Sequence, residues 1–315
     1  MKREPRTILI IGVTGTGKGR LAFDLAQSID AEIISIDSMK VYRRMDIGTA
    51  KPARWARQHV RYHLIDVVEP SEAFSVRTFL DYSLHAIGQI KDRNKPIIAV
   101  GGTALYVKAL LYGLFEGPAA DEQLRNELRQ QEKAEGLESL YNQLKEIDNI
   151  AAERINPNDS KRIIRALEVY KITGKPISSL QKQWKPNSMS SWTIIGLRRE
   201  KNDASNRINK RVKKMLSGGL VDEVKSLLVE EKPLSQQARC AIGYTEIIDY
   251  LNGLISLENA AELIKKNTRR LAKNQRTWFR TFRNVNWLNI GDEQSDEEIF
   301  DHAKILLRIR RDWNE

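Results

Sequence analysis

Residues 7–18, TILIIGVTGTGK, decide the fold of this chain. Thr7 to Ile11 is an apolar, mostly β-branched run that predicts a strand, and LAFDLAQSI at residues 21–29 has helical spacing. Between them, residues 12–18 match the phosphate-loop pattern G-x-x-x-x-G-K. In such a loop the backbone N–H groups and the positive end of the helix face phosphate oxygens, and Lys18 would neutralise the outer phosphate. The stretch therefore predicts a phosphate-binding loop rather than an ordinary glycine turn.

Two further apolar runs end in polar or glycine residues. Glu32 to Ile36 is followed by Asp37, and Pro96 to Val100 is followed by Gly101-Gly102-Thr103. Strands that alternate with helices are typical of parallel sheets, which bind ligands at the carboxyl ends of their strands. We therefore predict an α/β fold with a P-loop parallel-sheet core and a ligand site at that edge.

The composition changes after Gly117-Pro118. Long charged segments such as DEQLRNELRQQEKAEGLESLYNQL (121–144) predict an all-helical insertion domain, in which Asn158 or Asp159 caps a later helix that closes at Gly174. SWTIIGLR (191–198) predicts a return to the sheet. The expected domains are the first part of the core (1–117), the helical insertion (118–190), and the rest of the core with a basic, helical C-terminal region (191–315).

Charge is concentrated in two segments. The 315 residues carry 52 Lys and Arg against 41 Asp and Glu, a net charge of +11. Lys161 to Met215 holds 15 basic and three acidic residues, and Lys265 to Arg283 holds eight basic residues and no acidic one. Clustered basic residues favour a polyanionic partner such as nucleic acid, although solvated helix faces would give the same count.

Cysteine content and hydropathy exclude several classes. The single cysteine, Cys240, cannot form an internal disulfide or a multi-cysteine zinc site, which favours a reducing compartment. No apolar run reaches the roughly 18 residues of a membrane span. We expect a cytoplasmic chain that does not enter a membrane and, lacking any coiled-coil pattern, a monomer.

One position of the phosphate loop departs from the usual pattern. The residue after the lysine is normally Ser or Thr, whose hydroxyl binds Mg²⁺, and here it is Gly19. Phosphate binding would survive this change, whereas a metal ligand is lost. Thr14, Thr16 or water are the candidate replacements, and the metal ligands stay unassigned.

The remaining motifs identify a family resemblance. They are AEIISIDSMKVYRRMDIGTAKP (31–52), VGGTALYVKALLYGL (100–114), NDSKRIIRALEVYKITGKPIS (158–178), RINKRVKKMLSGGLVDEV (207–224), AIGYTEIIDYLNG (241–253) and TRRLAKNQRTWFR (268–280). Together they strongly resemble the tRNA dimethylallyltransferases, in the family's order and over nearly the whole chain. The resemblance implies Mg²⁺-dependent transfer of a dimethylallyl group from its diphosphate to the exocyclic amine of an adenosine in tRNA. In this family the adenosine is 3′-adjacent to the anticodon of tRNAs that read codons beginning with U.

The resemblance also assigns the chemistry. The exocyclic amine is a weak nucleophile, so a base must take its proton as the new bond forms. Asp37 matches the family's general base, and Thr103 and Lys18 are the other catalytic candidates. The expected diphosphate-binding residues are Gly12, Val13, Thr14, Gly15, Thr16, Gly17, Lys18, Gly19, Arg207 and Arg211, with Lys214 on the same predicted helix face.

Contacts to tRNA are implied at several positions. The adenosine is expected against the segment after the second strand and against Thr103. The resemblance implies further tRNA contacts in the insertion and in the stretch from Cys240 to Thr245. Basic residues on both sides would secure the RNA while the base turns outward. The positions are Asp37, Ser38, Met39, Lys40, Thr103, Arg125, Lys161, Arg162, Ile163, Ile164, Arg165, Cys240, Ala241, Ile242, Gly243, Tyr244 and Thr245.

Some residues depart from the family, and two other functions stay open. Lys40 replaces the usual Gln or apolar residue, Ala104 replaces Gly, and Asn274 replaces Arg. One alternative is a kinase or prenyltransferase acting on free adenine nucleotides, which would not need the basic segments. The other is a non-catalytic tRNA-binding paralogue, in which Gly19 marks lost chemistry.

Overall fold

The computed structural model describes residues 6–115, 117–181 and 192–308. The chain divides into two compact units, and each is described here by itself. The larger comprises Met1–Leu110 and Met189–Glu315, and the smaller comprises Leu111–Ser188, where the sequence predicts an insertion over 118–190.

The larger unit is built on a parallel six-stranded sheet with the order β3-β2-β4-β1-β5-β6. The strands are β1 (Thr7–Gly12), β2 (Glu32–Ile36), β3 (Tyr62–His63), β4 (Ile97–Gly101), β5 (Thr193–Arg199) and β6 (Val285–Ile290). All strand pairs are parallel. The predicted α/β class, the three N-terminal strands and the return at β5 are confirmed.

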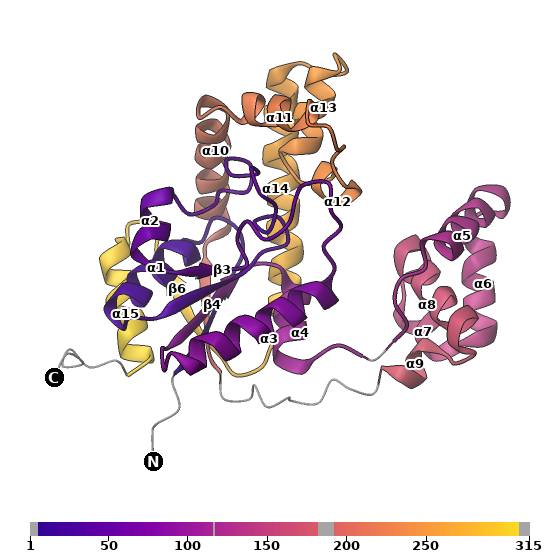
Figure 1. Cartoon of the computed structure of the whole chain (residues 1–315), viewed down its shortest axis with the longest axis horizontal. Coiled ribbons are helices and arrows are strands. Elements are labelled where there is room, and N and C mark those ends of the chain that lie inside the picture. Colours follow the sequence, from indigo (N-terminus) through magenta and orange to yellow (C-terminus); the bar gives the residue numbers. More distant parts are fainter. Residues whose placement is uncertain (1–5, 116, 182–191, 309–315) are drawn as a thin grey trace. The chain divides into compact units, whose positions relative to one another are not determined.

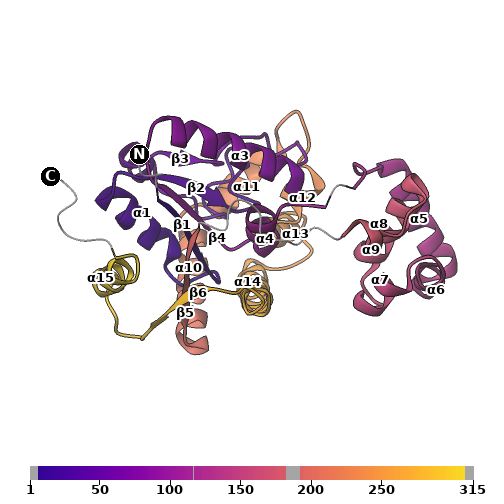
Figure 2. The same cartoon turned by 90° about the horizontal axis from the view of Figure 1, so that it is seen from below.

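Helices cover both faces of this sheet (Figures 1 and 2). On one face, alternate strand residues such as Ile8 and Ile10 pack in one apolar cluster with α1 (Lys18–Ser28), α2 (Arg54–His59) and α15 (Asp296–Leu306). On the other face, α14 (Leu257–Phe279) packs on β1 and α3 (Val76–Asp92) packs on β2. Helix α4 (Ala104–Tyr112) lies beside α3, where the rings of Tyr106 and Phe79 stack.

A helical group extends from the carboxyl side of the sheet (Figure 1). It consists of α10 (Lys201–Ser217), α11 (Leu220–Leu228), α12 (Gln236–Arg239), α13 (Tyr244–Leu251) and the first half of α14. Helix α10 buries Ala204, Ile208, Val212 and Met215 on one side, which is the apolar stripe that its sequence predicts. The basic residues of α10 are left on its other sides.

The smaller unit is all-helical, as the sequence predicts. It contains α5 (Glu122–Glu135), α6 (Leu137–Ile147), α7 (Asn149–Arg154), α8 (Ser160–Thr173) and α9 (Ile177–Leu180) around its own apolar core. The Asp159 side chain caps α8 by accepting from the Arg162 N–H, and Gly174 ends the helix in a left-handed conformation. Both ends of α8 therefore follow the predicted capping signals.

In the part of the chain that the structure describes, none of the helices has both the length and the apolar character needed to cross a bilayer.

Candidate functional site

Three neighbouring strands place the predicted catalytic segments together. In the order β2-β4-β1, Asp37 follows β2, Thr103 follows β4 and the phosphate loop follows β1. Their carboxyl ends open into a pocket of about 1230 Å³ that is lined by all three segments. Parallel strands present their carboxyl ends at one edge, which explains this convergence.

The phosphate loop has the expected conformation before α1. Gly15 and Gly17 take positive φ values of 87° and 93°, which favour glycine. The amides of Lys18 and Gly19 begin the helix and have no intrahelical acceptor, so they can face an anion. Thr16 is fully buried and its hydroxyl donates to the Val13 carbonyl at 2.9 Å.

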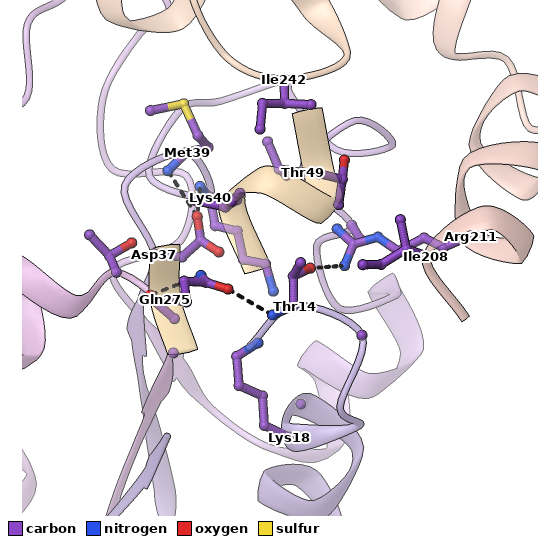
Figure 3. A pocket seen from close by; sticks show the side chains of 18 of the residues that line it. Thr14, Lys18, Asp37, Met39, Lys40, Thr49, Ile208, Arg211, Ile242 and Gln275 are labelled. Carbon is purple, nitrogen blue, oxygen red and sulfur yellow. Dashed lines mark hydrogen bonds between the residues drawn. The ribbon is translucent and has the colours of Figure 1, made fainter. Parts of the chain in front are cut away.

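A buried glutamine from α14 anchors the loop from the opposite face of the sheet. The Thr14 N–H donates to Gln275 Oε1 at 2.8 Å, and Gln275 Nε2 donates to the Gly102 carbonyl at 2.9 Å (Figure 3). The two bonds join the loop after β1 to the loop after β4. They also commit one loop amide to the protein rather than to a phosphate.

Helix α10 supports the loop from a third side. Arg207 Nε donates to the Gly15 carbonyl at 2.9 Å, and Arg211 Nη1 donates to Thr14 Oγ1 at 3.2 Å. Both arginines line the pocket, whereas Lys214 is exposed and lies outside its lining. The geometry thus supports Arg207 and Arg211 as anion contacts and gives Lys214 no place there.

Asp37 is oriented by its own backbone. Its Oδ1 accepts from the N–H groups of Met39 at 2.9 Å and Lys40 at 3.3 Å, and no hydrogen bond to Oδ2 comes from the described residues. Thr103 Oγ1 accepts from the Ser38 N–H at 3.3 Å, which joins the segments after β2 and β4. One carboxylate oxygen therefore stays available toward the pocket.

The pocket is strongly electropositive. Burial, with Lys40 and Arg211 nearby, lowers the pKa of Lys18 to about 7, and Asp37 opposes this shift. Burial also lowers the pKa of Lys40 and the pKa of Arg211, with Asp37 again opposing. These three cations lie near the Asp37 carboxylate, and their combined positive charge favours an anionic ligand.

A second carboxylate fixes the loop that carries the MDIGTAKP motif. Glu223 of α11 accepts from the N–H groups of Asp46 at 2.8 Å, Ile47 at 2.7 Å and Gly48 at 3.1 Å, and from the Tyr244 hydroxyl at 2.6 Å. A Cβ at Gly48 would collide with the Tyr244 ring. In this loop, Gly48, Thr49, Ala50 and Pro52 contribute to the pocket lining.

The predicted RNA contacts in the larger unit mostly meet at this pocket. Its lining includes Ser38, Met39, Lys40, Cys240, Ala241, Ile242 and Tyr244. Gly243 and Thr245 lie outside the lining, as do Gly12, Val13 and Thr16 of the predicted diphosphate set. Cys240 and Thr245 are exposed, whereas Gly243 and Tyr244 are buried and shape the turn before α13.

The remaining predicted RNA contacts belong to the smaller unit. Arg125 and Arg165 both pair with the fully buried Glu168, at 3.0 and 2.6 Å. Ile163 and Ile164 are core residues of this unit. Lys161 and Arg162 are exposed on α8, where Arg162 pairs with Asp159 at 3.3 Å, so both side chains are accessible to a partner in solution.

The donor set does not form a Mg²⁺ site of its own. Gly19 has no side-chain oxygen, and the Thr16 hydroxyl is buried in its bond to Val13. Thr14 Oγ1 already accepts from Arg211. The carboxylates in the pocket lining are Asp37, Asp203 and Asp292, and Asp203 is paired with Arg199 at 2.8 Å. Within the described ranges, no group of three or more His, Cys, Asp or Glu could ligate a metal. Any Mg²⁺ here would depend on ligands that the substrate supplies.

Comparison with known proteins identifies the family. The family model described as IPP transferase matches residues 40–282. A tRNA dimethylallyltransferase from Acetivibrio thermocellus is 44% identical over 302 residues, with 95% of this chain and 96% of the relative covered. The chain belongs to the IPP transferase family. Members named tRNA dimethylallyltransferase also include the Geobacter metallireducens protein, 43% identical with 91% of this chain and 94% of the relative covered.

Solved structures of the family agree with this fold. The tRNA isopentenylpyrophosphate transferase of Bacillus halodurans superposes with a TM-score of 0.69 at 40% identity, with 96% of this chain and 97% of that chain covered. A eukaryotic dimethylallyltransferase described as acting on tRNA gives a TM-score of 0.77 at 28% identity, with 95% and 78% covered. These relatives support the prenyltransferase interpretation over the two alternatives.

Two residues of this family member were not singled out by the sequence analysis. Gln275 lies in the Q-x-T-W-F motif and Glu223 in GGLVDEV, so both motifs were recognised without a role for these side chains. A polar residue in an amphipathic helix predicts a solvated position. Their buried or half-buried contacts depend on which loops face them in three dimensions.

Proposed function

We propose that this chain transfers the dimethylallyl group of dimethylallyl diphosphate to the exocyclic amine of the adenosine 3′-adjacent to the anticodon, in tRNAs that read codons beginning with U. The product is an isopentenyladenosine and inorganic pyrophosphate. The observation that carries the proposal is the placement of Asp37, with a free carboxylate oxygen, in one pocket with the phosphate loop and three cations. The names of its relatives supply the substrate class.

The residues divide the reaction between two sides of the pocket. The bond between the allylic carbon and the diphosphate oxygen breaks, and the diphosphate keeps the electron pair. Lys18, Arg211 and the first amides of α1 would neutralise the charge that develops on the leaving group. Because these donors are already fixed by the loop and α10, little reorganisation accompanies that step.

The acceptor side depends on Asp37 and Thr103. The adenosine nitrogen forms its bond to the allylic carbon, and its proton passes to Asp37 Oδ2, which completes the balance of the reaction. The Thr103 Oγ1 accepts from Ser38, so its own hydroxyl hydrogen can donate to the adenine ring. Thr103 thereby positions the base against Asp37.

We propose that Mg²⁺ binds together with the diphosphate rather than at a site formed by the protein alone. Since the donor set provides no complete site, the ion would be held by diphosphate oxygens and water. The proposed reaction takes place in the cytoplasm. We also propose that the chain acts as a monomer, since its sequence has no coiled-coil pattern.

A transfer assay tests the function. Purified protein is incubated with labelled dimethylallyl diphosphate and bulk tRNA that lacks the modification, with Mg²⁺ and without it. We expect label in an anticodon-loop adenosine. Label in free AMP but not in tRNA would instead favour the free-nucleotide enzyme, and tRNA binding without transfer would favour the non-catalytic paralogue.

Asp37→Ala separates catalysis from recognition. A general base contributes about 10²- to 10⁴-fold, so transfer should fall by at least about a hundredfold. Because Asp37 accepts hydrogen bonds, among the described residues, only from its own loop amides, tRNA affinity should stay within about threefold of the parent. A large loss of tRNA binding would reassign Asp37 to recognition.

A further inference from the structure

One cation of the pocket has no role in the mechanism described above. Lys40 leaves the loop after β2, runs past Asp37 and directs its amine toward the phosphate loop at Thr14 (Figure 3). Lys18 Nζ, from the start of α1, donates to the carbonyl of the preceding loop residue, Val13, at 3.4 Å, and Arg211 approaches Thr14 from α10. Three elements that are far apart in the sequence thus aim their cations at one place.

These cations lack the counter-charges that structural cations have. Among the described residues, no carboxylate lies within ion-pair distance of any of the three, in contrast to Lys51, which pairs with Asp46 and Asp66 in the neighbouring loop. Burial lowers the pKa of Lys40, Asp37 opposes this, and Arg211 and Lys51 add to it. Gathering unpaired cations in one recess is unfavourable unless an anion neutralises them.

Gly19, the loop position that usually carries a metal-binding hydroxyl, directly follows Lys18 of this cluster. Gly19 carries no oxygen ligand, and a Cβ built there would meet no atom within 4 Å. Charge on a diphosphate can be neutralised by a metal ion or by ammonium and guanidinium groups, and charge-assisted hydrogen bonds from the latter are strong. Lys40 supplies such a group on the side of the loop that faces Asp37.

We propose that Lys40 is a direct ligand of the diphosphate. Together with Lys18 and Arg211 it neutralises charge that a Mg²⁺ ion held by a loop hydroxyl would otherwise neutralise, and so lowers the dependence of this chain on Mg²⁺. The inference rests on the proposed function for the identity of the substrate. It assigns a diphosphate contact to a segment whose other residues are expected to line the adenosine.

The experiment measures inorganic pyrophosphate binding by isothermal titration calorimetry, first in EDTA and then in saturating Mg²⁺. The full chain is compared with Lys40→Gln and with Lys40→Arg. Lys213→Gln is the matched control, because Lys213 is exposed on α10, outside the pocket lining, and removes the same charge. Far-UV circular dichroism and thermal melts confirm that the variants fold.

In EDTA, Lys40→Gln should weaken pyrophosphate binding by about ten- to a hundredfold, the usual range for one hydrogen bond to a charged group. Lys40→Arg should retain most of the parent's affinity for pyrophosphate, and Lys213→Gln should change that affinity by less than about twofold. The loss of pyrophosphate affinity caused by Lys40→Gln should be smaller when Mg²⁺ is present. Equal affinity of Lys40→Gln and the parent in EDTA would overturn the proposal.

Two further measurements separate this inference from the function on which it rests. If Lys40→Gln binds pyrophosphate normally but loses affinity for an unmodified anticodon stem-loop, the lysine contacts RNA and the proposal is wrong. If the parent binds pyrophosphate through Lys40 but transfers no label to tRNA, the proposed function fails while the anion contact stands. If the parent transfers label and Lys40 has no effect on pyrophosphate, the inference alone fails.

Discussion

Replacing Gln275 with Leu tests whether α14 organises the catalytic loops. The side chain is 9% exposed, and both of its hydrogen bonds are buried. Leu has a similar volume but can neither accept from the Thr14 N–H nor donate to the Gly102 carbonyl. The change therefore removes the link between the loop after β1 and the loop after β4 with little change in packing.

The magnitude follows from the two backbone groups that lose their partners. Each buried, unsatisfied group costs about 1–3 kcal/mol, while the additional apolar surface of Leu returns about 1–2 kcal/mol. The net loss of stability is about 1–4 kcal/mol. A domain of about 150–250 residues shifts by about 2–4 °C per kcal/mol, so the midpoint of thermal unfolding should fall by about 2–15 °C.

The assay is differential scanning calorimetry followed by steady-state transfer kinetics. Lys273→Leu is the control, because Lys273 is exposed two residues earlier on the same helix. We expect the KM for dimethylallyl diphosphate to rise in Gln275→Leu while affinity for tRNA changes little, since the displaced loop binds phosphate. A melting midpoint within 1 °C of both the parent and the control, with unchanged KM, would refute the role of Gln275.

Two further predictions concern charge in the pocket. Because burial and two neighbouring cations lower the pKa of Lys18 to about 7, pyrophosphate must restore its proton on binding, and this uptake should grow from pH 6 to pH 8 toward one proton. Titration calorimetry in buffers of different ionisation enthalpy measures the uptake, which should be smaller by that amount in Lys18→Arg; equal uptake in both would contradict the shift. Gly19→Thr has open space for its side chain and should lower the Mg²⁺ concentration that half-saturates transfer. An unchanged concentration in that titration would show that position 19 is not what limits the metal.

The strands and their terminal residues could be predicted because each is specified locally. The run Glu32–Ile36 is fully buried and uniformly apolar apart from its first and fourth residues, and β2 has those bounds. The phosphate loop is specified by its glycines, whose positive φ values few other residues adopt. The caps of α8 are likewise local signals.

Other elements could not be predicted because their sequence patterns are weak. The sequence predicts helices in the C-terminal region, whereas Val285–Ile290 forms the edge strand β6. Its residues are mostly half-buried or exposed, so the alternation that marks a strand is lost. Strand β3 has only two residues and ends the sheet on the other side, which leaves no periodic signal at all.

Part of the site can be predicted from local sequence, and part depends on the three-dimensional fold. The residues that the motifs mark for chemistry, such as Asp37 and Lys18, could be found because chemistry requires their side-chain types. The contacts that place them are backbone constraints. A Cβ at Gly101 would collide with the Ile36 carbonyl, so the end of β4 before Thr103 can approach the end of β2 before Asp37 only because residue 101 is glycine. The family motifs in this chain therefore contain two kinds of residue: those whose side chains take part in the reaction, and those that allow two strand ends to pack closely. Only the three-dimensional structure shows which motif residues react and which are structural. Lys40 is not needed for the two strand ends to approach each other, so its charge in the pocket calls for a role in ligand binding.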